Sequence, residues 1–158
     1  MNSLEFLNFN QFSLDRKTKK KLFIERLNYL HEHHNLNCDI YRKTTNKIFN
    51  LSGKIKEVEE FPFIPVSIFK NFDVKSITEK EQFKILTSSG TTGQIPSRIF
   101  LDKDSAKLQQ VALSKIFTHV LGNERLPMMI IDSKSVLKNR DSFSARGAGI
   151  LGISIFGK

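Results

Sequence analysis

Phe83-Lys84-Ile85-Leu86, followed by Thr87-Ser88-Ser89-Gly90-Thr91-Thr92-Gly93, is the stretch around which the chain is organised. The apolar run predicts a short strand, and the Gly/Ser/Thr cluster predicts the tight loop that leaves it. Glycine lets the backbone approach a ligand closely, and successive exposed N–H groups form a concave nest for anions. The hydroxyl groups add donors. The loop is therefore predicted to cradle phosphate, with an ordinary flexible Ser/Gly linker as the alternative.

The segments after the loop predict an α/β arrangement. Arg98-Ile99-Phe100-Leu101 predicts a second strand that forms a hairpin with the first. Asp102 or Asp104 is predicted to cap a helix that ends at Gly122, and the wide apolar face of this helix predicts packing on a sheet. Residues 127–132 form a continuous apolar run, which is typical of a buried parallel strand. A helix between two strands predicts a right-handed crossover unit.

Residues 133–147 are predicted to form a polar loop. It begins at Asp132-Ser133, which would lie at the carboxyl edge of the sheet, where α/β proteins bind ligands. Arg146 is the residue of this loop that we assign to a carboxylate or a phosphate, because its planar guanidinium matches such groups. A structural ion pair is the alternative for Arg146. The apolar stretch that follows, residues 148–156, has no polar cap after it.

The N-terminal residues are predicted to be mainly helical. Ser13 or Asp15 can cap a helix that runs to about residue 34, and a second helix is predicted over about residues 38–49. Residues 3–12 are predicted to pack their aromatic side chains on the domain. Four apolar side chains share one face of the first helix at helical spacing. They are Leu22, Phe23, Leu27 and Leu30.

Proline residues interrupt regular structure after these helices. The block Phe61–Phe72 contains Pro62 and Pro65, which predict an extended path followed by a short helix or turn over residues 66–71. This apolar block is either a wall of an acyl pocket or a plain core segment.

The formal net charge of +9 favours binding of nucleic acid or, alternatively, attraction of ATP, an acyl phosphate or an acidic partner. The densest basic cluster, Arg16–Lys21, opens a predicted helix and contains no aromatic residue for base stacking. We therefore favour a solvated face over a nucleic-acid surface. His31, His33 and His34 lack the i, i+4 spacing of metal-binding helices, which favours a polar helix end over a metal site. The single cysteine, Cys38, is predicted to be buried and unreactive.

The sequence also bears on localisation. No apolar stretch approaches the roughly 18 residues of a membrane span. Residues 1–10 lack the basic start and the cleavage site of a signal peptide. The lone cysteine excludes an internal disulfide. We therefore expect a cytoplasmic protein without a membrane span.

The loop departs from the standard phosphate-binding motifs, because Gln94 rather than lysine follows Gly93 and no GxGxxG sequence is present. Residues 88–93 resemble instead the signature loop of the adenylate-forming enzymes, (T/S)SG(T/S)TG followed by proline and usually a basic residue. Here Pro96 is shifted by one position, and Arg98 is the nearest basic residue.

Three further blocks narrow this resemblance: residues 61–70 before the loop, and residues 130–133 and 142–148 after it. Together with the loop they make the chain similar to the acyl-protein synthetases of bacterial bioluminescence, the LuxE-type long-chain fatty acid–luciferin component ligases. The similarity extends from about residue 60 to the last residue.

This resemblance implies an α/β fold that is the N-terminal part of an adenylate-forming-enzyme-like fold. Residues 1–60 would form a helical segment, and residues 61–158 would begin the adenylating core, a sheet with packed helices that is incomplete at its C-terminal side. The implied reaction is ATP-dependent activation of a carboxylic acid, expected to be a fatty acid, as an acyl-adenylate, followed by transfer to a protein thiol, with ATP and Mg²⁺ as cofactors. The nucleotide-binding residues are then expected to be Ser88, Ser89, Gly90, Thr91, Thr92, Gly93 and Arg146.

The family's acidic ribose ligand, its C-terminal lysine and its acyl-accepting cysteine belong to sequence after residue 158, and Cys38 does not match the position of that cysteine. We therefore expect an N-terminal fragment that needs a C-terminal part or partner chain and is inactive in full turnover by itself. One alternative is a non-catalytic binding module that docks on a partner through its apolar tail. The other is a basic nucleic-acid-binding domain.

Overall fold

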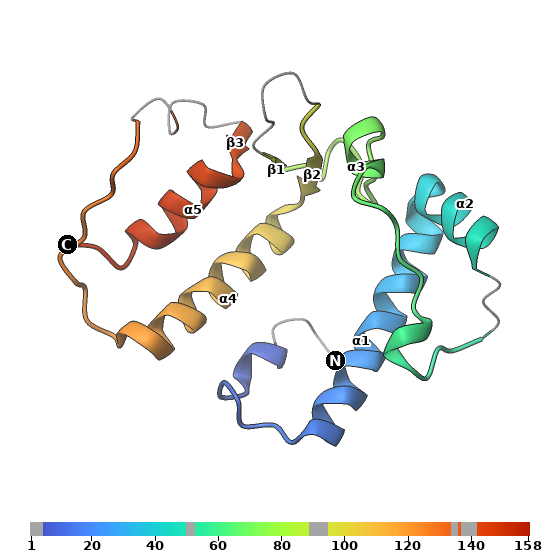
Figure 1. Ribbon diagram of the computed structural model, residues 1–158, viewed down its shortest axis with the longest axis horizontal. Helices are drawn as coiled ribbons and strands as arrows, with labels where there is room; N and C mark the ends of the chain where they lie inside the picture. The colour runs from blue at the N-terminus through green and yellow to red at the C-terminus, as the bar shows by residue number, and fades with distance from the viewer. Residues whose placement is uncertain (1–4, 50–52, 89–94, 134–135, 137–141) are drawn as a thin grey trace. The chain divides into compact units, whose positions relative to one another are not determined.

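The computed structural model describes residues 5–49, 53–88, 95–133, 136 and 142–158 (Figure 1). The chain divides into two compact units, Met1–Ile77 and Thr78–Lys158, called unit 1 and unit 2 below. The assignment of residues 1–60 to a helical segment and of residues 61–158 to an adenylating core stays a prediction.

Unit 1 is helical. Its elements are the 3-10 helix η1 (Glu5–Asn8), the helices α1 (Arg16–Asn37) and α2 (Asp39–Ile48), the 3-10 helix η2 (Val58–Glu60) and the short helix α3 (Ile68–Asn71). Both long helices were predicted. Asp15 caps α1, because its carboxylate accepts the backbone N–H groups of Lys17 at 2.8 Å and Thr18 at 3.0 Å. This confirms one of the two predicted caps.

A few polar contacts hold unit 1 together. Asn28 on α1 donates from Nδ2 to the carbonyl of Ile55 at 2.8 Å, and its Oδ1 accepts the N–H of Ile55 at 3.0 Å. Ile55 is buried, so this reciprocal pair satisfies two backbone groups that water does not reach. Thr45 on α2 is fully buried, and its hydroxyl donates to the carbonyl of Tyr41 at 2.9 Å. Cys38, between the two helices, is buried as predicted.

Two expectations for unit 1 are met only in part. Phe12 is not buried: its φ of 62° lies in the left-handed region, and its side chain is 91% exposed. The apolar face of α1 is only partly covered: Leu22, Leu27 and Leu30 are half-buried, Phe23 is 48% exposed, and α1 has no buried residue. The helix is covered by α2 and by the segment around Ile55, and polar side chains make much of that contact.

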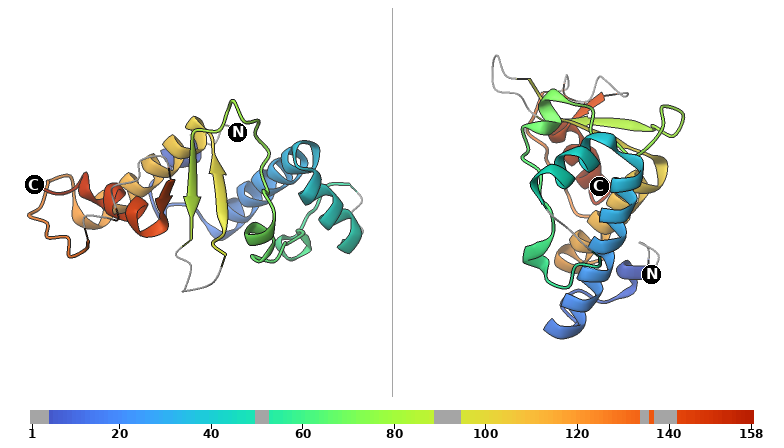
Figure 2. Two further views of the ribbon diagram at one scale, coloured as in Figure 1. Left: turned by 90° about the horizontal axis from the view of Figure 1, so that it is seen from above. Right: turned by 90° about the vertical axis from the view of Figure 1, so that its right-hand side faces the viewer.

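Unit 2 combines a small mixed sheet with two helices, which agrees with the predicted α/β class. Its elements are β1 (Lys84–Thr87), β2 (Arg98–Leu101), α4 (Lys103–Leu121), β3 (Ser142–Ser144) and α5 (Ala145–Ser154). The strand order is β2-β1-β3. β1 and β2 form the predicted antiparallel hairpin (Figure 2), and β3 runs parallel to β1.

Both ends of α4 agree with the prediction, which placed an N-cap at Asp102 or Asp104 and the end of the helix at Gly122. The Asp102 carboxylate accepts the N–H of Ser105 at 2.6 Å, which satisfies a donor that has no partner within the helix. Gly122 ends the helix with a φ of 80°, and its N–H donates to the carbonyl of Thr118 at 2.9 Å. A positive φ is readily adopted by glycine, so the helix stops here.

The predicted strand at residues 127–132 is wrong. The parallel neighbour of β1 is β3, which lies inside the predicted polar loop of residues 133–147; α5 also begins within that range. With β2 on one side of β1 and β3 on the other, both edges of β1 are occupied. Met129 and Ile131 are consequently 86% and 92% exposed. A backbone bridge from Leu126 to Gly157 anchors the start of the segment.

The expectation that the sheet buries the apolar face of α4 is also wrong in part. The helix contacts β2 and α5, yet none of its residues is buried, and Val120 near its end is 75% exposed. Strand length explains this. A four-residue strand is about 13 Å long, whereas a 19-residue helix is about 28 Å long, so the sheet covers only the start of α4.

Candidate functional site

The base of the predicted phosphate loop is closed by two serines. The N–H of Ser88 donates to the carbonyl of Ser97 at 3.1 Å, and the N–H of Ser97 donates to the hydroxyl oxygen of Ser88 at 2.8 Å. The pair continues the hairpin register by one step beyond Thr87 and Arg98. The five other predicted loop residues lie outside the described residues. They are Ser89, Gly90, Thr91, Thr92 and Gly93.

This contact leaves Ser88 able to act as a donor. A serine hydroxyl carries one proton and two acceptor lone pairs, and the bond from Ser97 occupies one lone pair. Ser88 is exposed, so its proton can be directed to an anion held in the loop. Ser97, in contrast, is buried and contributes its backbone N–H and carbonyl to the pair.

The parallel strand β3 brings a second segment to the same edge of the sheet. Thr87 at the end of β1 lies opposite Ser144 at the end of β3. The carboxyl ends of parallel strands meet at one edge, and neighbouring strands are about 4.8 Å apart. The chain then passes directly from β3 into α5, whose second residue is Arg146 (Figure 1). The loop base and Arg146, far apart in the sequence, are thus neighbours in the fold.

The start of α5 adds positive electrostatic potential at this edge. The first N–H groups of a helix have no acceptor within the helix, and the helix dipole makes this end partly positive. Together with the guanidinium of Arg146, this arrangement suits an anion.

Arg146 forms an ion pair, which was the alternative to phosphate or carboxylate binding predicted for this residue. Its Nε lies 3.1 Å from Oδ2 of Asp132, whose Oδ1 accepts the N–H of Ser133 at 2.6 Å. The Arg146 side chain is 64% exposed and that of Asp132 is 20% exposed. Asp132 was predicted to lie at the ligand edge as the end of a strand. It is instead held near this edge by its ion pair with Arg146. The binding of phosphate by Arg146 stays a prediction.

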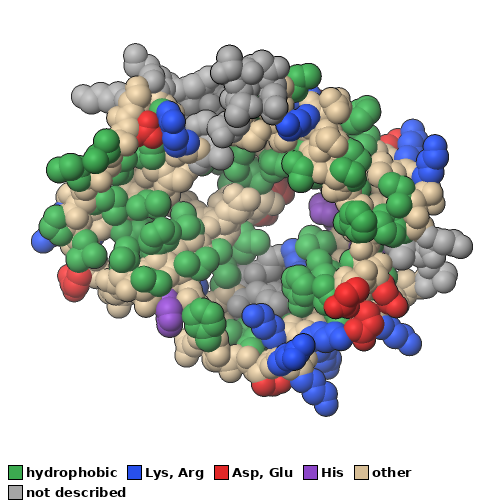
Figure 3. All heavy atoms as spheres, viewed as in Figure 1, with side chains coloured by type: hydrophobic (Ala, Val, Ile, Leu, Met, Phe, Trp, Pro, Cys, Tyr) green, Lys and Arg blue, Asp and Glu red, His purple; other side chains and the backbone are tan. Residues whose placement is uncertain are grey.

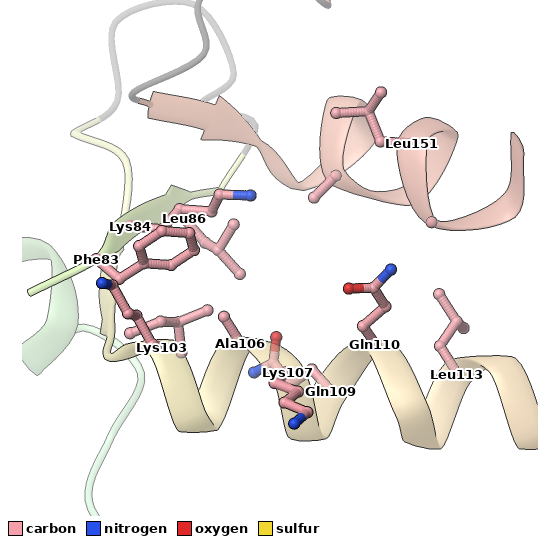
Figure 4. Close-up of a pocket in the computed structure, with 13 residues that line it drawn as sticks. Phe83, Lys84, Leu86, Lys103, Ala106, Lys107, Gln109, Gln110, Leu113 and Leu151 are labelled. Carbon is pink, nitrogen blue, oxygen red and sulfur yellow. The ribbon is translucent and has the colours of Figure 1, made fainter. Parts of the chain in front are cut away.

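A groove of about 620 Å³ lies between α4 and α5 and is closed at one end by β1 (Figure 4). Its size falls within the range of small-molecule sites. Its lining is mostly apolar, with three lysines and two glutamines. The residues that line it are Phe83, Lys84, Leu86, Leu101, Lys103, Ala106, Lys107, Gln109, Gln110, Leu113, Ala148, Leu151 and Gly152.

The block Phe61–Phe72, the predicted wall of an acyl pocket, is not part of this lining. It belongs to unit 1, where it contains the predicted short helix, α3, at Ile68–Asn71. The ring of Phe63 meets that of Phe49 edge to face, with their centroids 5.2 Å apart. Phe63 is nevertheless 72% exposed, so this contact does not make the block a core segment, and the acyl-pocket role stays a prediction.

Sequence reasoning missed Ser97 and the three lysines of the groove. Ser97 could have been found, because the hairpin register extended by one residue pairs it with Ser88. The lysines Lys84, Lys103 and Lys107 carry no such signal, since their proximity depends on the packing of α4 beside β1 and α5.

The histidines of α1 have partners in unit 1. Nδ1 of His31 lies 2.9 Å from the hydroxyl of Tyr41, and Nδ1 of His34 lies 2.7 Å from the hydroxyl of Ser76. Burial lowers the pKa of both histidines, and the nearby His33 and Arg26 lower the pKa of His34 further. Among the described residues, no three His, Cys, Asp or Glu side chains form a group that could hold a metal ion.

No described helix combines the length and the apolar character needed to cross a membrane. A comparison with protein families finds that the family model described as "Acyl-protein synthetase, LuxE" matches residues 4–157. No curated protein and no solved structure matches the chain.

Proposed function

The chain belongs to the LuxE family of acyl-protein synthetases, as its sequence motifs predicted, and on this premise we propose that unit 2 binds the nucleotide in an ATP-dependent activation of a carboxylic acid. The acid's carboxylate attacks the α-phosphate of ATP, which gives an acyl-adenylate and releases pyrophosphate. A protein thiol then takes the acyl group and releases AMP. The adenylate-forming type of fold is part of the same proposal.

One observation carries this proposal: the pairing of Thr87 with Ser144. It supports a single anion site made from the loop after β1 and the start of α5. Activation of a carboxylate by ATP depends mainly on neutralising and orienting phosphate groups, which N–H donors and a guanidinium can do without a protein nucleophile.

Each part of this edge would have its own role. Ser88 and the hydroxyls of residues 89, 91 and 92 would donate to the β- and γ-phosphates, while Gly90 and Gly93 would allow the backbone to approach them. Arg146 would bind a phosphate oxygen through its terminal nitrogens. The ion pair with Asp132 uses Nε, so the guanidinium can make both contacts.

Mg²⁺ would be held largely by the phosphate oxygens and by water. Such coordination is usual for Mg²⁺, which often takes only one or two protein carboxylates. Asp132, whose carboxylate pairs with Arg146 at this edge, would be one such carboxylate.

The test is binding of Mg-ATP to the 158-residue chain and to variants, measured by calorimetry. Arg146→Ala should weaken binding by about tenfold or more, since a hydrogen bond to a charged group contributes about 1.5–3 kcal/mol. Arg125→Ala, which removes an exposed arginine elsewhere in unit 2, is the matched control and should leave binding unchanged.

A second pair of variants examines the loop base. Ser88→Ala should weaken Mg-ATP binding, because it removes both the proposed donor and the acceptor for Ser97. Ser97→Ala retains the backbone groups of that pair and should bind like the parent chain. Equal affinity of the Ser88, Arg146 and parent proteins would contradict the proposed site. ATP–pyrophosphate exchange with a panel of fatty acids would then measure whether the chain needs a further part for turnover.

A further inference from the structure

The first turns of α1 carry a dense group of cations on the surface of unit 1. This basic cluster consists of Arg16, Lys17, Lys19, Lys20 and Lys21, all of which are exposed. Lys and Arg side chains gather over the start of α1 in Figure 3. Lys20 pairs with Glu57 of the same unit. The other four cations form no ion pair with any described residue, so the cluster keeps a net positive charge.

This placement of charge disfavours the helix itself. The start of a helix is the partly positive end of its dipole, so cations are unfavourable there, and α1 has no acidic residue in its first turn. The N-cap carboxylate of Asp15 already accepts the N–H groups of Lys17 and Thr18. An anionic partner is therefore attracted by the side chains of the basic cluster rather than by the end of the helix.

A turn just before the basic cluster displays an aromatic side chain. The N–H of Ser13 closes this turn on the carbonyl of Asn10 at 3.2 Å, and the Ser13 hydroxyl donates to the same carbonyl at 2.7 Å. Phe12, the third residue of the turn, has a φ of 62°, which glycine or asparagine adopts far more readily than a bulky residue. Its side chain is 91% exposed, so the turn presents a phenyl ring where the backbone favours glycine.

Two further phenylalanines flank the basic cluster. Phe9 precedes the turn and is 42% exposed, and Phe23 follows the cluster on α1 and is 48% exposed. Because residues three and four apart are neighbours on a helix surface, Phe23 lies beside Lys19 and Lys20. Apolar side chains that gather on a surface beside charged groups mark an interaction site.

Both features are unfavourable in water and become favourable at one kind of surface. Cations are attracted to anionic lipid, and phenyl rings partition into the boundary between head groups and acyl chains. We propose that residues 9–23, called the docking surface below, bind the surface of an anionic lipid bilayer, with Phe12 inserted and the basic cluster over the head groups. This inference goes beyond the proposed function and does not depend on it.

Nucleic acid is the competing polyanion, and the observations favour the bilayer. Stacking of bases uses aromatic rings that alternate with cations along the path of a strand, whereas the basic cluster contains no aromatic residue. The cluster occupies six residues of helix, a length of about 9 Å, which corresponds to only about three phosphates of one strand. A bilayer offers the same few cations a surface of head groups and gives the phenyl ring an apolar layer to enter.

The first experiment measures cosedimentation of the 158-residue chain with unilamellar vesicles. Vesicles of phosphatidylcholine with about 30% phosphatidylglycerol should bind the chain, and vesicles of phosphatidylcholine alone should bind it at least about tenfold more weakly. Binding to the anionic vesicles should fall when NaCl is raised from about 0.05 M to about 0.5 M, because salt screens the charges. Equal binding to the two kinds of vesicle would overturn the proposal.

The second experiment tests whether the basic cluster is responsible. Lys17→Glu, Lys21→Glu should weaken binding to the anionic vesicles by about tenfold or more, because each cation near such a surface contributes about fivefold. Lys43→Glu, Lys47→Glu is the matched control: it makes the same change of charge, at the same spacing, on exposed residues of α2, and should lose clearly less. Equal losses would mean that overall charge attracts the chain, which would contradict the docking surface.

The third experiment asks whether the ring at the turn enters the bilayer. Phe12→Trp gives the chain its only tryptophan, whose emission should shift to shorter wavelength on anionic vesicles and be quenched by brominated lipids. Phe72→Trp is the control, since Phe72 is 52% exposed and lies four residues before Ser76, which contacts His34 near the other end of α1. Its emission should not change. A tryptophan at position 12 that stays in water in the bound chain would overturn the proposal.

The last variant separates binding from folding. Phe12→Gly places a residue that favours a positive φ at the turn, so the melting temperature should be at least that of the parent chain. Binding to anionic vesicles should nevertheless fall by about fivefold or more, because the inserted ring is lost. Unchanged binding would contradict the role of Phe12. If a single-stranded DNA oligonucleotide binds the parent chain more tightly than the vesicles do, and the Lys17, Lys21 variant loses both, the surface binds nucleic acid and the proposal is wrong.

Discussion

Unit 1 and unit 2 are stabilised by different kinds of interaction. In unit 1, polar side chains join segments that lack regular pairing: Asn28 holds both backbone groups of Ile55, and His34 contacts Ser76. In unit 2, backbone pairing of β1 with β2 and β3 sets the positions of the strands. Leu101, the last residue of β2, is buried.

This difference explains why the candidate site lies in unit 2. A backbone register aligns whole segments, so residues distant in sequence, such as Ser88 and Arg146, reach the same edge together. The contacts of unit 1 each join one side chain to one other residue. They stabilise a helical pair, and they leave its histidines bonded to neighbours rather than directed to a common ligand.

The two units can be followed separately, because both tyrosines of the chain, Tyr29 and Tyr41, lie in unit 1 and the chain has no tryptophan. Tyrosine fluorescence therefore reports unit 1. Hydrogen exchange of peptides from β1, β2 and α4 reports unit 2.

Leu101→Ala should have the largest effect and should act on unit 2. Leu101 is 6% exposed, and truncating a buried leucine costs about 2–5 kcal/mol, so we expect a loss of about 2–3 kcal/mol in the stability of unit 2. Exchange of the β1 and β2 amides measures it. Ile99→Ala, on the same strand but 38% exposed, should cost clearly less. An equal shift in the tyrosine transition would contradict the assignment of this effect to unit 2.

Asn28→Ala should have the next largest effect and should act on unit 1. The change leaves the N–H and the carbonyl of buried Ile55 without their partner, and an unsatisfied buried group costs about 1–3 kcal/mol. We expect about 2 kcal/mol less stability in the tyrosine-detected unfolding transition. Asn37→Ala removes a hydrogen bond between exposed groups of α1, to the carbonyl of His33, and should change the transition little. Similar losses in the two variants would refute the role of Asn28.

Asp102→Ala should weaken unit 2 by about 1 kcal/mol, the usual effect of removing a helix N-cap. The change leaves the N–H of Ser105 without its acceptor, so amide exchange in the first turn of α4 should rise. Asp102→Asn keeps an oxygen in the same place and should retain most of the stability. If the asparagine variant loses as much as the alanine variant, the carboxylate contributes in another way.

The smallest expected effect is a pH dependence confined to unit 1. Burial lowers the pKa of His34 and His31 in the folded state below their ordinary value of 6.5. The unfolded chain therefore binds more protons as the pH falls below about 6.5, and stability that is fully present above that value is lost. Tyrosine-detected unfolding at pH 7.5 and 5.5 measures this.

His34→Gln should reduce that pH dependence, because it removes the more deeply covered imidazole while keeping a polar group near Ser76. His119→Gln, in unit 2, is the control and should leave the tyrosine transition unchanged at both pH values. A parent chain whose unit 1 gains stability on acidification would contradict the assignment.

Local signals predicted much of the fold. The hairpin, the caps Asp15 and Asp102 and the stop at Gly122 follow from interactions within a few residues, and each is confirmed. The errors concern pairing over long distances. Residues 127–132 have the apolar character of a strand but no place beside β1, whereas Ser142–Ser144 forms the strand with only one apolar residue.

The residues of the candidate site show the same contrast between local signals and long-range pairing. Residue chemistry alone pointed to Ser88 and Arg146, since a hydroxyl-rich glycine loop and a guanidinium suit anions wherever they occur. The family resemblance grouped the two as nucleotide-binding residues, whereas their placement at one edge of the sheet depends on the parallel pairing of β1 with β3, which no local signal indicated. The lysines of the groove went unpredicted for the same reason: they come together only when α4 packs beside β1 and α5.

The family, the N-caps of α1 and α4, the end of α4 and the hairpin were thus encoded in short motifs, whose caps, turns and hydroxyl groups act over a few residues. The placement of Ser88 and Arg146 at one edge of the sheet, the exposure of residues 129–131 and the packing of α4 beside β1 and α5 were not. A strand needs a neighbour to satisfy its backbone groups, and which segment supplies that neighbour is decided by competition across the whole unit.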